Sequence, residues 1–278
     1  MKALLAKKQA GRKFPRLAAA VLGSILFGCL FAELLSSHDP TYMDLSHCAL
    51  PPGPVFLFGT DAMGRDIFSM IWSGGRVSLF IGLTATAVST GAAVVFGTAC
   101  GCAPSWLNAL LTRTAELLLS VPSLLAVVFL QAILGQKNPL ALAFVLGLTS
   151  WPGMAKLVAT EVLRIRGSEF VVAARALGSG FFRVLGRHLA PNFLPSILFM
   201  AVMEVRSAMM AEATLSFMGL GLPPEFISWG GMLSLAEKTP GDWWVVVIPG
   251  LFLTATLLCV TSLGNWLREG GHGKMSNL

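Results

Sequence analysis

Residues 77–112, VSLFIGLTATAVSTGAAVVFGTACGCAPSWLNALLT, contain no Asp, Glu, Lys or Arg. A helix that crosses the hydrocarbon core of a bilayer needs about 20 mostly apolar residues, and this run is longer than that. Uncharged runs of the same kind recur at residues 117–136, 138–155 and 243–267. Together these runs predict an all-α integral membrane protein.

The composition of the whole chain agrees with a bilayer as solvent. Of its 278 residues, 55% are hydrophobic and 12% are charged, and the mean hydropathy is +0.73. A soluble domain carries about 25% charged residues. The net charge of +6 lacks the aromatic-basic interleaving of single-strand binders, so we expect no nucleic-acid partner. Basic residues instead flank the cytoplasmic ends of membrane helices.

We expect six transmembrane helices. Their predicted bounds are 17–35, 78–103, 113–135, 139–160, 193–218 and 243–266. The first run is longer than the apolar region of a cleaved signal peptide and has no clear small-x-small cleavage site. We therefore interpret it as a retained helix that enters from the cytoplasm. An even number of spans then returns the C-terminus to the cytoplasmic side.

The distribution of basic residues supports this orientation. Fifteen Lys and Arg residues fall in cytoplasmic segments, whereas only Arg65, Arg76, Lys137 and Lys238 fall outside. This is the bias of the positive-inside rule. The predicted organisation is a basic cytoplasmic N-terminus at 1–16, a first span at 17–35, an extracytoplasmic loop at 36–76, a transmembrane domain at 77–267 and a cytoplasmic tail at 268–278.

The chain shows no pattern for a metal site or for nucleotide binding. Cys100 and Cys102 lack the two-residue spacer of a zinc site. His38, His47 and Cys48 lack a fourth ligand at a sensible spacing. The pattern G-x-x-x-x-G-K-[ST] is missing from the sequence, so we do not expect this chain to bind ATP.

The predicted outer loop ends in FGTDAMGRDIFSMIWSGGRVSL, at residues 58–79. Asp61 is expected to cap a short helix. Arg65 and Asp66 would then face water or a partner. Ile67 and Ile71 belong to an apolar side that would lie along the outer membrane surface.

A second polar stretch, SEFVVAARALGSGFFRVLGRHLAPN at residues 168–192, lies in the long cytoplasmic loop. Glu169 suits the positive, N-terminal end of a helix dipole. The small side chains of Ala173 and Ala174 would let another surface approach the helix closely. The helix would break at Gly178, and a second short helix would follow it up to Pro191. Two short helices that meet at a glycine elbow could dock on a partner, or they could merely anchor the loop at the membrane surface.

This stretch resembles the EAA motif of ATP-binding-cassette (ABC) importer permeases, in the version of the dipeptide, oligopeptide and nickel permease family. In that family the motif forms a coupling helix, here at 168–190, which docks into a groove of the ATP-hydrolysing subunit. The residues that the resemblance assigns to this coupling are Glu169, Ala173, Ala174, Arg175, Gly178 and Pro191. Ala190 departs from the leucine that usually precedes the proline.

Two more stretches resemble the same family. The outer-loop motif resembles its N-terminal signature through Gly59, Thr60, Asp61, Gly64, Arg65 and Asp66. ATLSFMGLGLPPEFISWGGML, at residues 213–233, is similar to its fifth-helix and outer-loop signature. In TRTAELLLSVPSLL, Glu116 stands where the family usually has Asp, and the charge is kept.

The resemblance implies a type I ABC importer permease fold with six transmembrane helices and a cytoplasmic coupling helix. It implies a permease subunit in the bacterial cytoplasmic membrane that moves small peptides or nickel and metal chelates and is not itself an enzyme. The implied partners are a second permease, two ATPases that carry ATP and magnesium, an extracytoplasmic solute-binding protein and membrane lipid. No cofactor is expected on this chain.

Three charges fall inside the predicted fifth span: Glu204, Arg206 and Glu212. A charge at membrane depth costs about 2.5–3.5 kcal/mol, so these side chains should face protein or a watery path. They are candidates for the translocation path, and the alternative is pairing with the partner permease. An ion-coupled secondary transporter is the other functional hypothesis, although we find no inverted repeat of the kind such transporters use.

Overall fold

The computed structural model describes residues 14–135, 138–169, 171, 190–237 and 241–275. These residues form an all-helical bundle. The elements are α2 (Arg16–Leu30), α3 (Ala32–Leu35), η1 (Leu45–His47), α4 (Ile67–Cys102), α5 (Ser105–Leu119), α6 (Ser123–Leu134), α7 (Pro139–Arg166), α10 (Ala190–Phe217), α11 (Trp229–Ser234), η3 (Leu235–Glu237) and α12 (Trp243–Met275). The predicted all-α class is therefore confirmed.

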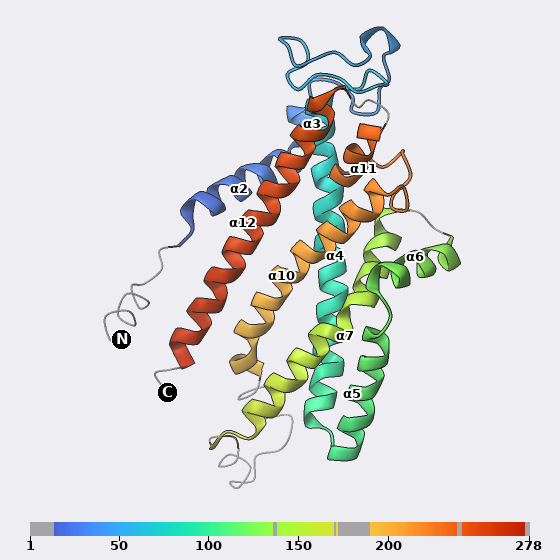
Figure 1. Ribbon diagram of the computed structural model, residues 1–278. Coiled ribbons are helices and arrows are strands. Elements are labelled where there is room, and N and C mark those ends of the chain that lie inside the picture. Colours follow the sequence, from blue (N-terminus) through green and yellow to red (C-terminus); the bar gives the residue numbers. More distant parts are fainter. Residues whose placement is uncertain (1–13, 136–137, 170, 172–189, 238–240, 276–278) are drawn as a thin grey trace.

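Helix α4 runs through the middle of the bundle, and loop 36–66 caps one end (Figure 1). Its tightest partner is α7. A Cβ added at Gly97 would lie 2.6 Å from the carbonyl oxygen of Ala155, and one at Gly101 would lie 2.6 Å from a methyl carbon of Val162. Only glycine at these positions lets the two backbones approach so closely, which is a common way to pack helices in membranes.

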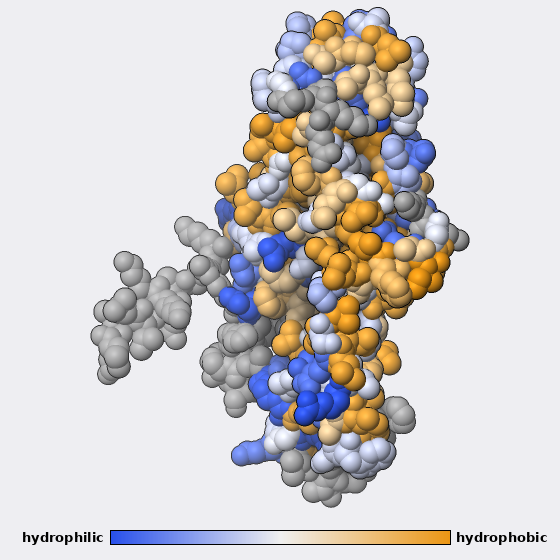
Figure 2. All heavy atoms as spheres, turned by 45° about the vertical axis from the view of Figure 1, so that its right-hand side comes forward, coloured by the Kyte–Doolittle hydropathy of each residue, from blue (hydrophilic) through white to orange (hydrophobic). Residues whose placement is uncertain are grey.

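Three of the described helices are long and apolar enough to cross a membrane: α4, α7 and the Trp243–Arg268 part of α12. The pair α5–α6 passes the same test only as a unit, which raises the number to four. Apolar side chains cover the middle of the face drawn in Figure 2, and hydrophilic ones gather towards its lower end. Helix α10 has the length of a span, but its three charges make it less apolar. Six spans therefore stay a prediction.

The predicted span at 113–135 is not one straight helix. The structure divides it into α5 and α6, which are bent by 83° relative to each other (Figure 1). Pro122 lies at the break and has no N–H to donate to the preceding turn, and it restricts the backbone of Val121. An uninterrupted helix is therefore unfavourable at this position.

The start of α4 also differs from the prediction. The helix begins at Ile67 rather than at 78, because the carboxylate of Asp66 accepts the N–H groups of Phe68 and Ser69. Asp61 does not cap a helix. The expected surface helix was wrong as well, since Ile67 and Ile71 are buried in the core cluster that contains Trp229 of α11 and Trp244 of α12. These indoles cover the apolar side that we assigned to the membrane surface.

Candidate functional site

The outer-loop motif forms a folded cap over the helix bundle. Gly59 and Gly64 have φ angles of +78° and +73°, in the left-handed region that favours glycine. A side chain at Gly64 would also overlap the carbonyl of Asp44. Thr60 ties the cap to α12, because its carbonyl accepts the indole N–H of Trp244 at 3.1 Å. The two glycines of the motif are thus needed for the turns themselves.

Asp61 and Arg65 form the centre of this cap. The Oδ2 atom of Asp61 accepts the Nε–H of Arg65 at 2.8 Å and the Nη2 group at 2.7 Å, while Oδ1 accepts the N–H groups of Met63 and Arg65. Arg65 is only 6% exposed, and Asp66 is buried too. Our expectation that Arg65 and Asp66 face water was wrong. Arg65 forms an ion pair with Asp61, and the carboxylate of Asp66 accepts backbone N–H groups at the start of α4.

A second acidic residue of the loop, Asp44, holds the 3₁₀ helix η1. Its carboxylate accepts hydrogen bonds from the hydroxyl and N–H of Ser46 and pairs with the ring of His47. The bonds from Ser46 and His47 lower the pKa of Asp44 from 3.8 to about 2.

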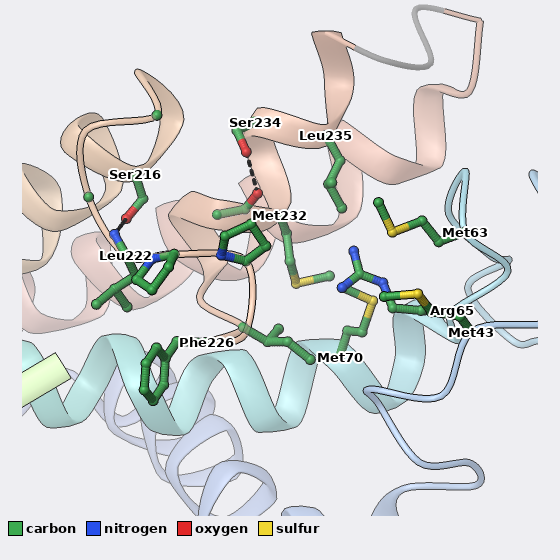
Figure 3. A pocket seen from close by; sticks show the side chains of 16 residues that line it. Met43, Met63, Arg65, Met70, Ser216, Leu222, Phe226, Met232, Ser234 and Leu235 are labelled. Atoms are coloured by element: carbon green, nitrogen blue, oxygen red, sulfur yellow. Dashed lines mark hydrogen bonds between the residues drawn. The ribbon is translucent and has the colours of Figure 1, made fainter. Parts of the chain in front are cut away.

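A cavity of about 360 Å³ opens beside the cap. Its walls come from the loop and the start of α4 on one side, and from the segment after α10 with α11 on the other. Figure 3 shows the guanidinium of Arg65 among the side chains of Met43, Met63, Met70 and Met232. Methionine side chains are flexible and polarizable, so this lining can adapt its shape.

Glu212, one of the predicted path residues, is sealed inside the protein. It is 0% exposed. Its carboxylate accepts hydrogen bonds from Ser78 of α4 at 3.1 Å, Ser216 of α10 at 2.9 Å and Ser228 at 2.7 Å. Ser228 is the N-cap residue of α11. One carboxylate thus joins α10 to the neighbouring α11 and to α4, whose Ser78 lies 134 residues earlier in the sequence.

All three serine hydroxyls donate their protons to Glu212. The oxygen of Ser78 also accepts the N–H of Trp229, and that of Ser228 accepts the N–H of Gly231. Three converging O–H donors suit a negative carboxylate. Within the part of the chain that the structure describes, no cation forms an ion pair with Glu212.

The other two charges of the predicted path lie in different surroundings. Glu204 is half-buried and lies beside Ser150 of α7, whereas Arg206 is exposed. The three charges therefore do not form one cluster, and only Glu204 and Arg206 reach the surface of the isolated chain. Their place in a path stays a prediction.

The structure reveals a further polar contact that we did not single out from the sequence. Glu116 of α5 pairs with Lys156 of α7 at 3.2 Å and with Arg113 at 3.1 Å. Lys156 belongs to a row of small or polar residues on α7 with Thr149, Gly153 and Thr160, which are four, three and four residues apart. That spacing was available in the sequence as a signal.

The structure describes the predicted coupling segment only near its two ends. Helix α7 ends at Arg166, Glu169 is exposed beyond it, and Pro191 lies in the first turn of α10. The other predicted coupling residues, Ala173, Ala174, Arg175 and Gly178, lie outside the described residues. Among the described residues, no group of three or more His, Cys, Asp or Glu side chains could hold a metal ion.

A helical bundle with several membrane-length apolar helices and a folded cap defines a multi-pass membrane protein. Residues 93–270 match the family described as "Binding-protein-dependent transport system inner membrane component", and the chain belongs to this family. It is similar to the dipeptide transport system permease protein DppC of Bacillus subtilis, with 34% identity over 94% of this chain and 82% of the relative. It is also similar to the oligopeptide transport system permease protein OppC of the same organism, with 35% identity over 86% of this chain and 77% of the relative.

Family membership fixes the general role of the chain. It is the permease component of a binding-protein-dependent ABC importer in the inner membrane. A permease component does not hydrolyse ATP itself, and the system includes an ATPase and a binding protein as partners. The resemblance noted in the sequence is thereby confirmed.

Proposed function

We propose that this chain is a permease subunit that imports small peptides. Two relatives that match most of its length are named for dipeptide and oligopeptide transport, which supports peptides over nickel or metal chelates as cargo. The six spans would be α2 with α3, α4, the bent pair α5–α6, α7, α10 and α12. Both termini would then lie in the cytoplasm of a bacterium, in accord with the bias of the basic residues.

The coupling helix at 168–190 would receive force from the ATPase. Glu169 would begin this helix, Ala173 and Ala174 would let it seat closely, and Gly178 would form the elbow. Arg175 would meet the ATPase surface, and Pro191 would begin the return into the membrane. The segment joins α7 to α10, so movement of the segment would be carried by both helices.

The complete transporter would contain a second, homologous permease, two ATPases and an extracytoplasmic solute-binding protein that docks at the cap. The cap residues Gly59, Thr60, Asp61, Gly64, Arg65 and Asp66 would keep the docking face rigid. Lipid would cover the apolar middle of the bundle. We propose no role for nucleic acid and no cofactor on this chain.

The experiment is uptake of a labelled dipeptide and of nickel by proteoliposomes that contain the complete transporter. We expect ATP-dependent dipeptide uptake. A Gly178→Trp variant should lose uptake but keep hydrolysis, because overpacking a fitted contact costs about 1–3 kcal/mol. Gly241→Trp is the control, since nothing lies within 4 Å of a Cβ at that glycine. Uptake driven by an ion gradient without ATPase subunits would disprove the proposal.

A further inference from the structure

The cavity beside the cap is lined by both outer motifs of the sequence. Met63 and Arg65 come from the outer-loop motif at residues 58–79, and Met232 comes from the stretch at residues 213–233. These stretches lie far apart in the chain, and the proposed function gives the second one no role. Their meeting at one cavity suggests a task for both.

The cavity has an exposed mouth and a buried floor. Met43 is 56% exposed, whereas Met70 and Met232 are 1% and 2% exposed. The volume of about 360 Å³ is at the lower end of the range of about 300–1,000 Å³ that is typical of small-molecule sites. The cavity therefore has room for a ligand of the size of a short peptide.

Arg65 offers unused hydrogen-bond donors to this cavity (Figure 3). Asp61 takes up its Nε–H and its Nη2 group. Among the described residues, nothing accepts a hydrogen bond from Nη1, although Arg65 is only 6% exposed. The other polar side chains of the described lining, Ser216 and Ser234, already donate to groups of the protein. A buried donor without an acceptor is unfavourable, so the cavity is complementary to a ligand with an acceptor oxygen.

The charges of the cap favour an uncharged acceptor. The guanidinium of Arg65 is balanced by Asp61 at 2.7 Å, and Asp66 adds another carboxylate to the same motif. A carboxylate in the cavity would be repelled by both aspartates. A carbonyl oxygen accepts the same hydrogen bond without adding charge. With methionines around it, the cavity suits a main-chain carbonyl beside an apolar side chain.

We propose that this cavity is an outer binding site for peptide cargo. Nη1 of Arg65 would donate to a main-chain carbonyl, and the methionines would pack around the neighbouring apolar side chain. This proposal rests on the proposed function, in which the cap lies on the side from which an importer receives its cargo. Methionine side chains are flexible, so the site would accept apolar side chains of different shapes.

The first test measures binding and needs no transport. In the membrane complex of both permeases and the ATPases, with native cysteines replaced, Met43→Cys places a thiol at the mouth of the cavity. Met218→Cys places one at a similarly exposed position, 60% against 56%, outside the described lining. The probe is N-acetyl-leucine amide, which has an apolar side chain and carbonyl groups but no charge. It should slow the reaction of Met43→Cys with a methanethiosulfonate and leave that of Met218→Cys unchanged.

Two related probes test the chemistry of the ligand. N-acetyl-glycine amide should need an at least about tenfold higher concentration for half-protection, because it lacks the side chain that would be buried. The free acid N-acetyl-leucine should also protect less well. Equal protection by the glycine probe, better protection by the acid, or no saturable protection by the leucine probe would overturn the proposal. Each result would leave the proposed function intact in a transporter that imports dipeptides.

The second test concerns the donor. Arg65→Lys keeps a charge opposite Asp61 but loses the planar fork, so half-protection should need about tenfold more leucine probe. Arg76→Lys changes an arginine outside the described lining and should have no effect. Met63→Gln leaves Arg65 in place and brings a competing carbonyl into the cavity, so it should weaken protection, whereas Met63→Leu should not. Wild-type protection in both Arg65→Lys and Met63→Gln would overturn the proposal, and Met63→Gln alone decides if Arg65→Lys does not fold.

Discussion

Replacing Glu212 by Gln tests whether the buried carboxylate holds α4, α10 and α11 together. Gln keeps one acceptor oxygen, which can still receive the hydroxyls of Ser216 and Ser228. Its NH₂ group takes the place of Oε2, however, and faces the hydroxyl of Ser78. The oxygen of Ser78, which already accepts the N–H of Trp229, can accept the amide N–H with its second lone pair. The hydroxyl proton of Ser78 then loses the carboxylate oxygen as its acceptor.

Two routes give the magnitude. A hydrogen bond to a charged group contributes about 1.5–3 kcal/mol, and one such bond is lost. Hydrogen bonds between membrane helices contribute about 0.6 kcal/mol on average and at most about 1.7 kcal/mol, so the upper end of that range gives a similar value for the one lost bond. We therefore expect the free energy of unfolding to fall by about 2 kcal/mol.

Denaturant unfolding of the purified complex measures this loss, and hydrogen exchange locates it. The amides of Trp229 and Gly231 should exchange faster in the variant, because both bind serines of the network. Glu225→Gln is the matched control, as it is the same chemical change at an exposed position of the neighbouring loop. Unfolding within about 0.5 kcal/mol of the wild type, with unchanged exchange at α11, would refute the reasoning.

Three further predictions concern the cap and the central helix pair. Gly64→Ala should destabilise the cap by about 1–3 kcal/mol through its left-handed backbone, seen as faster proteolysis of loop 36–66. Gly101→Leu should lower the unfolding free energy by about 1–3 kcal/mol through overpacking against α7, measured in denaturant; an unchanged midpoint would contradict the close approach. Asp44 titrates at about 2 rather than 3.8, so it stabilises the folded loop above pH 3.8 and this contribution is lost as the pH falls through 2. Hydrogen exchange of the Ser46 amide should show that acid transition in the wild type and not in Asp44→Asn.

The class of fold was predictable because it depends on the length and hydrophobicity of single segments of the chain. Uncharged runs such as residues 77–112 are long enough to specify membrane helices whatever they pack against. The bend before α6 was predictable too, since Pro122 is visible inside an apolar run. We missed it because the length of the run fits a single straight span.

The candidate sites were less accessible, because they depend on contacts between distant segments. Nothing in the sequence links Glu212 with Ser78 and Ser228, and serine is too common to stand out. The burial of Arg65 escaped us for a similar reason, since it depends on how the loop folds over the bundle. Lys156 is different, because the polar row to which it belongs on α7 can be recognised from the three- and four-residue spacing in the sequence.

The glycine contacts between α4 and α7 also determine where this protein can bend. Backbones in such close contact cannot slide or rotate against each other without steric overlap, so the two helices behave as one rigid body. Changes of shape must then be absorbed at the joints of the chain, at Phe31 between α2 and α3 and at Pro122 between α5 and α6. Helices α4 and α7 should therefore move together as one rigid body, and movement of either helix should be carried by both.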